Sequence, residues 1–204
     1  MDSKKHWEDV YTTKSSDSVS WFQPNAEKSL GIIQGLDIAK NSNVIDIGCG
    51  ASTLVDDLLQ HGYLNLSVLD LSAAALEVAE SRLGSAASKV QWREEDVTKL
   101  TLEKHSVDVW HDRAVFHFLT NEDDRNNYVK SVLHAVKPGG YVIVATFAED
   151  GPEECSGLPV QRYSASELHS QFGSPFTLLG HEKEIHKTPF GTTQSFVYCY
   201  CRKE

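Results

Sequence analysis

Short apolar runs alternate with segments whose apolar residues recur at helical spacing along most of the chain. The apolar runs predict strands at 43–48, 65–70, 89–93, 107–111 and 141–147. The periodic segments predict a helix after Pro24 and further helices at 51–61, 72–84 and 121–136. Strands and helices that alternate in this way predict an α/β protein with a mostly parallel sheet and helices on both faces.

The C-terminal part has a different pattern. Ser164 and Glu167 have the spacing of a capping box, which predicts a short helix. Residues 176–186 and 194–201 alternate between apolar and polar positions with no helix between them, and Gly191 lies in the connection. This pattern predicts an antiparallel hairpin at the end of the sheet.

A glycine-containing turn follows the first predicted strand. Val44 to Ile47 is an apolar run broken only by Asp46, and Gly48 and Gly50 follow it. Glycine lets the backbone turn sharply and approach a ligand closely, and the next helix begins with free N–H groups. Asp70 ends the second strand twenty positions after Gly50, where a carboxylate can accept both hydroxyls of a ribose. These residues predict a nucleoside-type cofactor site.

Two cofactor classes use such a turn. A dinucleotide site prefers a third glycine three residues after the second, and this chain has Thr53 there. Asp46 would repel a pyrophosphate but would attract the ammonium and sulfonium groups of S-adenosylmethionine. The Asp-x-Gly-x-Gly pattern with Asp70 resembles motif I and the ribose acid of class I S-adenosylmethionine-dependent methyltransferases. An ordinary strand-turn-helix corner and a dinucleotide enzyme are the alternatives.

The resemblance extends over nearly the whole chain from residue 24 onward. It implies a Rossmann-like three-layer sandwich with a mostly parallel seven-stranded sheet and an antiparallel C-terminal hairpin. A chain of 204 residues is expected to form one methyltransferase domain, 1–204, in which 1–23 form an N-terminal cap or lid. The implied cofactor is S-adenosylmethionine.

Further cofactor contacts follow from the resemblance. An acid after the third strand accepts the adenine amino group in this family, which points to Asp96, or otherwise to Glu95. The backbone N–H of Val97 would then meet a ring nitrogen. Leu71 and Trp92 are candidates for packing on the adenine faces. A solvated acidic turn and ordinary core packing are the competing interpretations.

The N-terminal cap is rich in aromatic residues, which include Trp7, Tyr11, Trp21 and Phe22. A similar pattern opens the lysine methyltransferases related to the elongation-factor and citrate-synthase enzymes. The resemblance implies a lid that excludes water from the cofactor and the acceptor, with Tyr11 and Trp21 on the cofactor side. The alternative is a helix that packs on the sheet without touching a ligand.

Candidate catalytic residues follow the fourth strand. Its Asp-Arg-Ala step resembles the Asp-Arg-Gly of thiopurine methyltransferase-like enzymes and the Asp-Lys-Gly of the lysine methyltransferases. Asp112 could hold the methionine amino group or the acceptor, and His111 and His117 could accept a proton near neutral pH. Arg113 could instead lock Asp112 in a structural ion pair. The Asn-Pro-Pro-Tyr tetrad of adenine and glutamine methyltransferases is absent at this position.

Composition narrows the possible partners. The chain carries 29 acidic and 19 basic residues, and a net charge of −10 argues against nucleic acid. The four cysteines form neither a disulfide framework nor a metal-ligand cluster, so no metal is assigned and a cytoplasmic setting is expected. No apolar run reaches the roughly 18 residues of a membrane span, and the N-terminus has no secretory apolar core.

The expected reaction is methyl transfer from S-adenosylmethionine to a nucleophilic acceptor. A small molecule is the first choice of acceptor, and a protein lysine is the alternative. A cofactor-binding subunit without catalytic activity is the second alternative. The sequence leaves the acceptor atom and the oligomeric state open.

Overall fold

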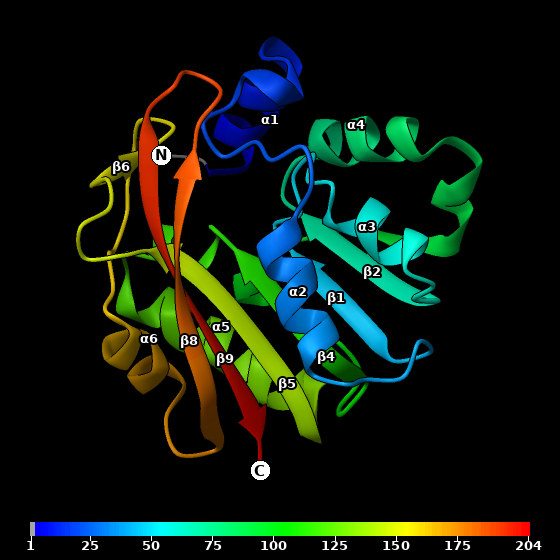
Figure 1. Ribbon diagram of the computed structural model, residues 1–204, viewed down its shortest axis with the longest axis vertical. Helices are drawn as coiled ribbons and strands as arrows, with labels where there is room; N and C mark the ends of the chain where they lie inside the picture. Colours follow the sequence, from blue (N-terminus) through cyan, green and yellow to red (C-terminus); the bar gives the residue numbers. More distant parts are fainter. Residues whose placement is uncertain (1–2) are drawn as a thin grey trace.

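A single mixed sheet forms the centre of the computed structural model, which describes residues 3–204 (Figure 1). Its seven strands follow the order β3-β2-β1-β4-β5-β9-β8. The strands are β1 (Asn43–Ile47), β2 (Asn65–Asp70), β3 (Val90–Glu94), β4 (Val107–Arg113), β5 (Val136–Phe147), β8 (Phe176–Lys187) and β9 (Thr193–Lys203). A separate two-stranded ribbon consists of β6 (Glu154–Cys155) and β7 (Leu158–Pro159).

The pairing of the strands confirms the predicted fold class. Strands β1 to β5 pair in parallel, whereas β9 runs antiparallel to both β5 and β8. Because β8 and β9 form the predicted C-terminal hairpin, only this end of the sheet is antiparallel. The carboxyl ends of the parallel strands therefore meet at one edge, where ligands bind in such folds.

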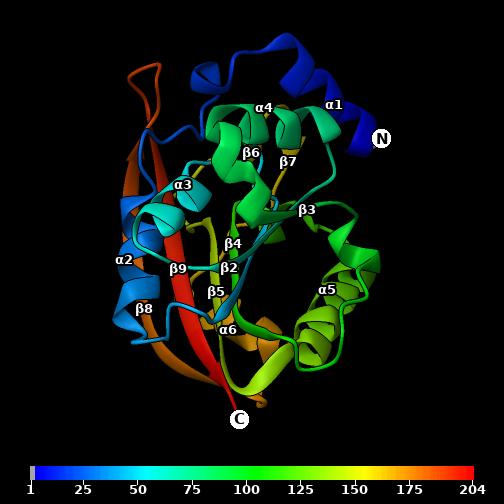
Figure 2. The same cartoon turned by 90° about the vertical axis from the view of Figure 1, so that its right-hand side faces the viewer.

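Helices cover both faces of the sheet. The helices are α1 (Ser3–Thr13), α2 (Glu27–Gly35), α3 (Leu54–Gln60), α4 (Ala73–Leu83), α5 (Glu122–Ala135) and α6 (Ala165–Phe172). One apolar core joins the sheet to α2, α3 and α4, and a second joins the opposite face to α5 and α6. Figure 2 shows α2 and α3 on one side of the sheet and α5 on the other.

Side-chain caps begin several helices where the sequence predicted them. Ser72 accepts a hydrogen bond from the backbone N–H of Ala75 at the start of α4. Ser164 and Glu167 form the predicted capping box of α6. Helix α3 begins three residues later than predicted, because the backbone N–H of Ser52 bonds to the carbonyl of Cys49 and continues the glycine turn.

The segment 137–140 connects α5 to the parallel part of the sheet. Strand β5 starts at Val136, earlier than predicted, and its register against β4 shifts between this residue and Tyr141. Gly139 has a φ of 79°, so the four residues form an irregular turn within the strand boundaries. The turn thus interrupts a strand instead of separating the predicted helix 121–136 from the predicted strand 141–147.

The N-terminal segment lies across the carboxyl edge of the sheet. Helix α1 packs beside α4, and a 3₁₀ turn, η1 (Ser16–Ser18), follows it (Figure 1). The predicted cap 1–23 is thus a helix and a turn, and its first two residues lie outside the described range. No helix within residues 3–204 has the length and apolar character needed to cross a bilayer.

Candidate functional site

The glycine turn after β1 is closely covered by other parts of the chain. Gly48 and Gly50 have φ values of 60° and 52°, in the left-handed region that favours glycine. A Cβ on Gly48 would overlap Val115, and a Cβ on Gly50 would overlap the hydroxyl of Tyr11. The turn therefore requires glycine at both positions, and the N-terminal segment reaches down onto it.

Asp70 lies beside this turn at the end of β2. Its Oδ2 accepts a hydrogen bond from the backbone N–H of Gly50 at 2.8 Å, and its Oδ1 accepts one from Ser72 at 2.9 Å. Burial raises the pKa of Asp70 to about 6, although these two N–H groups oppose the shift. Each carboxylate oxygen can accept two hydrogen bonds, so Asp70 can still accept one from a ribose hydroxyl even with the additional backbone contact from Leu71.

The lid residues form a connected aromatic wall. The indole Nε1 of Trp21 donates to the Tyr11 hydroxyl at 3.3 Å, and burial together with the Asp70 carboxylate raises the pKa of Tyr11. The ring of Trp7 meets Trp21 edge-on at 5.6 Å and Phe118 at 5.1 Å. The N-terminal aromatics are thus packed against each other and against the segment that follows β4.

A cavity of about 880 Å³, called here the large cavity, runs under this wall. One end, which we call the nucleoside end after the ligand predicted from the sequence, is lined by Asp70, Leu71, Glu94, Glu95, Asp96, Val97, Thr98, Lys99 and Asp124. The other end, the acceptor end, is lined by Trp7, Trp21, Arg113, Phe118, Cys155, Leu158 and Pro159. Tyr11 and Gly48 line it as well. The volume lies in the range of small-molecule and cofactor sites.

Asp96 is one of the residues that line the nucleoside end. Its Oδ1 accepts hydrogen bonds from the backbone N–H and the hydroxyl of Thr98, and its Oδ2 pairs with Lys99 at 2.9 Å. Burial raises the pKa of Asp96, but these bonds outweigh it, and the net pKa is lowered. The side chain is thus held as an ionised acceptor next to Val97, and its contact with adenine stays a prediction.

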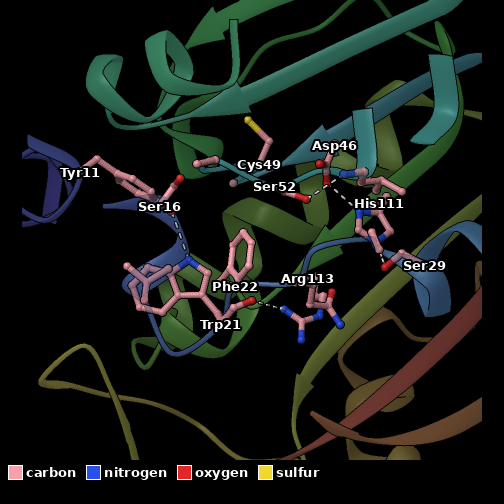
Figure 3. A pocket seen from close by; sticks show the side chains of 16 residues that line it. Tyr11, Ser16, Trp21, Phe22, Ser29, Asp46, Cys49, Ser52, His111 and Arg113 are labelled. Carbon is pink, nitrogen blue, oxygen red and sulfur yellow. Dashed lines mark hydrogen bonds and ion pairs between the residues drawn. The ribbon is translucent and has the colours of Figure 1, made fainter. Parts of the chain in front are cut away.

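A small cavity of about 60 Å³ lies beneath the turn (Figure 3). Asp46, His111 and Ser29 line one side of it. The Nδ1 of His111 lies 2.7 Å from Asp46 Oδ1, and its Nε2 lies 2.8 Å from Ser29 Oγ. Both ring nitrogens are engaged, which argues against the expected role of His111 as a base for an acceptor.

Asp112 does not lie in either cavity. It is fully buried, and its carboxylate accepts hydrogen bonds from the backbone N–H groups of Val115 and Phe116 and from the Tyr128 hydroxyl at 2.7 Å. Burial raises the pKa of Asp112 to about 7. These contacts give Asp112 a structural role in the turn after β4, in place of the catalytic role that was expected.

Arg113 does not form the ion pair with Asp112 that was the alternative to a catalytic role for Asp112. Successive residues of a strand point to opposite faces, and Arg113 points away from Asp112. Its Nε donates to the Tyr198 hydroxyl at 3.0 Å, and its Nη2 pairs with Glu184 at 3.4 Å. Its Nη1 donates to the backbone carbonyl of Trp21 at 3.4 Å.

His117 also lies outside both cavities. It is fully buried with its ring against Phe118 and Phe147, and it lines neither cavity. Its Nδ1 accepts a hydrogen bond from the backbone N–H of Phe147, and burial lowers the pKa of His117 to about 3. A group with so low a pKa is a poor proton acceptor at neutral pH, so the expected catalytic role of His117 is not supported.

Sequence reasoning did not identify Ser29, Glu8 or Cys155 as part of the site. Ser29 is buried on the apolar face of α2, and its spacing of three and four positions from Ile32 and Ile33 was the available signal in the sequence. Glu8 of α1 accepts a hydrogen bond from the Ser72 hydroxyl at 2.8 Å and so ties the lid to the start of α4. Cys155 comes from the β6–β7 ribbon, whose place at the cavity no local pattern indicates.

The described residues fit a nucleoside that carries a cationic tail. The glycine turn lets Tyr11 and Val115 approach its backbone closely, Asp70 can still accept hydroxyl donors, and Asp46 supplies a carboxylate beneath the turn. Within residues 3–204, no group of three or more His, Cys, Asp or Glu side chains is arranged to hold a metal ion.

Comparison with known proteins gives relatives of two kinds. Residues 44–140 match a family described as a methyltransferase domain. EEF1A lysine methyltransferase 2 of Danio rerio is 27% identical over 160 residues, which cover 72% of this chain and 69% of that protein. A ubiquinone biosynthesis O-methyltransferase of Cupriavidus pinatubonensis is 33% identical over 138 residues, which cover 62% of this chain but only 53% of that enzyme.

Solved structures share the whole fold. A protein from work on the conversion of a disulfide bond into a thioacetal group during echinomycin biosynthesis superposes with a TM-score of 0.82 at 17% identity, and the match covers 98% of this chain and 93% of that one. A methyltransferase from Anabaena variabilis gives a TM-score of 0.74 at 15% identity and covers 100% and 96%. The sequence match covers residues 44–140, a little under half of the chain, and includes the strand, turn and helix that build the site; the chain is thus similar to S-adenosylmethionine-dependent methyltransferases in this segment and shares their fold over its whole length.

Proposed function

We propose that this chain transfers the methyl group of S-adenosylmethionine to an uncharged or anionic nucleophile on a small, largely apolar molecule. The observation that carries the proposal is the distribution of charge along the large cavity. Its lining carboxylates belong to β2, β3, the segment after β3 and the start of α5, all at the nucleoside end. Aromatic and aliphatic side chains dominate the acceptor end, and its charged lining residue is Arg113.

An amine acceptor fits this end poorly. A lysine or alkylamine is protonated at neutral pH and must lose a proton before it can attack. The nearby histidines are engaged or buried and cannot readily take that proton. The charged residue that lines this end is a cation, Arg113, whose repulsion of an ammonium group is reduced but not reversed by its ion pair with Glu184. A thiol reaches its anionic form more easily, so it needs less help from a base. These features favour a soft or acidic nucleophile over an amine.

Arg113 is suited to face an anionic nucleophile. A guanidinium carries five N–H donors, and the contacts of Arg113 use three of them, two at the long distance of 3.4 Å. The side chain also lies over the ring of Phe196, which helps to hold it in place. The remaining N–H groups can therefore donate to an acceptor anion.

The chain itself is expected to contribute binding, orientation and exclusion of water. When bound, S-adenosylmethionine supplies a methyl group that its sulfonium already makes electrophilic. The aromatic wall of Trp7 and Trp21 covers the site, and an orienting site of this kind can contribute about 7–11 kcal/mol at best.

A matched pair of acceptors tests the proposal. Radiolabelled S-adenosylmethionine would be incubated with the protein and either phenylmethanethiol or benzylamine, which differ only in the nucleophilic group. We expect label in the thioether and little in the amine, and we expect Arg113→Gln to reduce transfer to the thiol. Transfer to benzylamine alone would overturn the proposal.

Methylation of a protein lysine is the second candidate, and the similarity to EEF1A lysine methyltransferase 2 favours it. Incubation of the protein and labelled donor with a cell lysate separates the two candidates. Label confined to a discrete protein band would support the lysine candidate. Label confined to the low-mass fraction would support the small molecule.

The proposal includes a cytoplasmic setting without nucleic-acid or membrane partners. The net charge of −10 supports the absence of a nucleic-acid partner. All four cysteines are buried and free, which is typical of a reducing compartment. The proposal makes no statement on oligomeric state.

A further inference from the structure

Three buried polar side chains form a continuous chain beneath the glycine turn. Ser29 of α2, His111 of β4 and Asp46 of β1 are only 1%, 2% and 5% exposed. The ring of His111 bridges the other two, at 2.8 Å from the serine and 2.7 Å from the carboxylate (Figure 3). Burying such groups is unfavourable unless they are hydrogen-bonded, so each link supports the next.

The direction of the hydrogen bonds follows from the groups themselves. An ionised carboxylate only accepts, so Nδ1 of His111 carries a hydrogen and donates it to Asp46 Oδ1. In the neutral ring, Nε2 then accepts from the hydroxyl of Ser29. The imidazole is therefore fixed from both sides, and it in turn fixes the orientation of the Asp46 carboxylate.

The second oxygen of Asp46 is the one left for a ligand. The contacts of Asp46 within residues 3–204 use Oδ1, and the residue lines the small cavity together with Gly48 and Cys49 of the turn. A carboxylate in so enclosed a space attracts a cation more strongly than it would in water. Arg113 also lines the cavity, but its guanidinium is paired with Glu184 at 3.4 Å. The part of the cavity beside Asp46 is thus suited to receive a small positively charged group.

We infer that Ser29 and His111 are positioning residues, which hold Asp46 so that its second oxygen accepts from the ammonium group of the cofactor's amino-acid tail. The inference rests on the proposed function, because it assumes S-adenosylmethionine as the methyl donor. It gives His111 a role in cofactor binding in place of proton transfer, and it brings α2 into the site through Ser29.

Two ligands that differ only in the tail test this inference. S-Adenosylhomocysteine carries the ammonium group, whereas 5′-methylthioadenosine keeps the nucleoside and lacks the amino acid. Titration calorimetry would measure both affinities for the wild type, Ser29→Ala and His111→Gln. We expect Ser29→Ala to weaken S-adenosylhomocysteine about 2- to 10-fold, the effect of one neutral hydrogen bond, and His111→Gln to weaken it further. The affinity for 5′-methylthioadenosine should stay within about twofold.

Two control variants separate positioning from general damage. Ser29→Thr keeps the hydroxyl and should retain most of the affinity for S-adenosylhomocysteine. Thr146→Val removes another fully buried hydroxyl, one that lines neither cavity, and should change neither affinity. Thermal unfolding of each variant would verify that it is folded.

Each outcome decides the matter. Selective loss of S-adenosylhomocysteine in Ser29→Ala and His111→Gln, with rescue by Ser29→Thr, supports the positioning role. Equal weakening of both ligands, or no weakening of either, overturns it. Failure of the wild type to bind either nucleoside would instead refute the proposed function, so the two failures are distinguishable.

Discussion

Replacing Asp70 by asparagine tests the ribose contact directly. Both oxygens of Asp70 already accept backbone N–H groups, from Gly50 and Ser72. An asparagine has one acceptor oxygen, and its amide group would face one of these N–H donors. The variant therefore loses a charged acceptor for ribose, and we expect S-adenosylhomocysteine to bind about 1–3 kcal/mol more weakly, or roughly 5- to 150-fold.

The stability of the same variant should change much less. Burial raises the pKa of Asp70 from 3.8 to about 6, a shift of roughly two units or about 3 kcal/mol. Because the folded-state pKa is raised, the stabilisation from protonated Asp70 is complete below pH 3.8 and is lost as the pH rises through 6. At pH 8 the ionised carboxylate thus opposes folding, and removing its charge offsets the hydrogen bond that is lost.

The pH profile of binding provides the sharpest measurement. With a pKa of about 6, Asp70 is roughly 90% protonated at pH 5, so the wild-type affinity for S-adenosylhomocysteine should fall about tenfold between pH 8 and pH 5. Calorimetry on Asp70→Asn should give a nearly flat profile. Asp57→Asn is a matched control, since Asp57 is a buried acid that accepts the backbone N–H of Ala26 and lines neither cavity. An Asp70→Asn variant with wild-type affinity at pH 8 would refute the reasoning.

Three further substitutions examine the turn, the lid and the segment after β4. Gly50→Ala adds a methyl group at a φ of 52° and against Tyr11, so urea unfolding should show a loss of about 1–2 kcal/mol; an unchanged midpoint would contradict this. Glu8→Ala removes the contact to Ser72, and limited proteolysis should then cut helix α1 faster, whereas an unchanged rate would argue against a latch. Burial raises the pKa of Asp112 to about 7. The stabilisation from protonated Asp112 is therefore complete below pH 3.8 and is lost as the pH rises through 7. Asp112→Asn should remove this pH-dependent contribution, so its free energy of unfolding relative to the wild type should increase between pH 5 and pH 8. The same dependence of the unfolding free energy on pH in both proteins would count against the argument.

Much of the fold could be predicted because its signals are local. The boundaries of β2 agree with the prediction, and the capping box of Ser164 and Glu167 lies at the start of α6. The start of α3 was harder to predict from the sequence, because it depends on the hydrogen bond by which Ser52 continues the glycine turn. The early start of β5 at Val136 depends on pairing with Val107 of β4, which no local pattern encodes.

The predicted cofactor residues follow from local sequence patterns, whereas the environment of the predicted catalytic residues depends on distant parts of the chain. Gly48, Gly50 and Asp70 are prescribed by a turn and by the ends of adjacent parallel strands, so their proximity follows from the pattern. The environment of His111 depends instead on Ser29, which is 82 positions away in the sequence. His117 is likewise neutralised by burial against Phe147. A histidine next to a strand end could therefore be located from the sequence, but its protonation state could not.

The two ends of the large cavity also differ in how the chain builds them. The nucleoside end is made mainly by β2, β3 and the residues that follow them, within the segment 44–140 that matches the methyltransferase family, and Lys4 of α1 reaches Glu94 there. The acceptor end adds Trp7 and Trp21 from the lid and Cys155 and Leu158 from the β6–β7 ribbon, which lie outside that segment. If these outer parts select the acceptor, a relative named for a lysine acceptor and a relative named for an oxygen acceptor can both resemble this chain. Exchanging the β6–β7 ribbon should alter acceptor preference while the affinity for S-adenosylhomocysteine is retained.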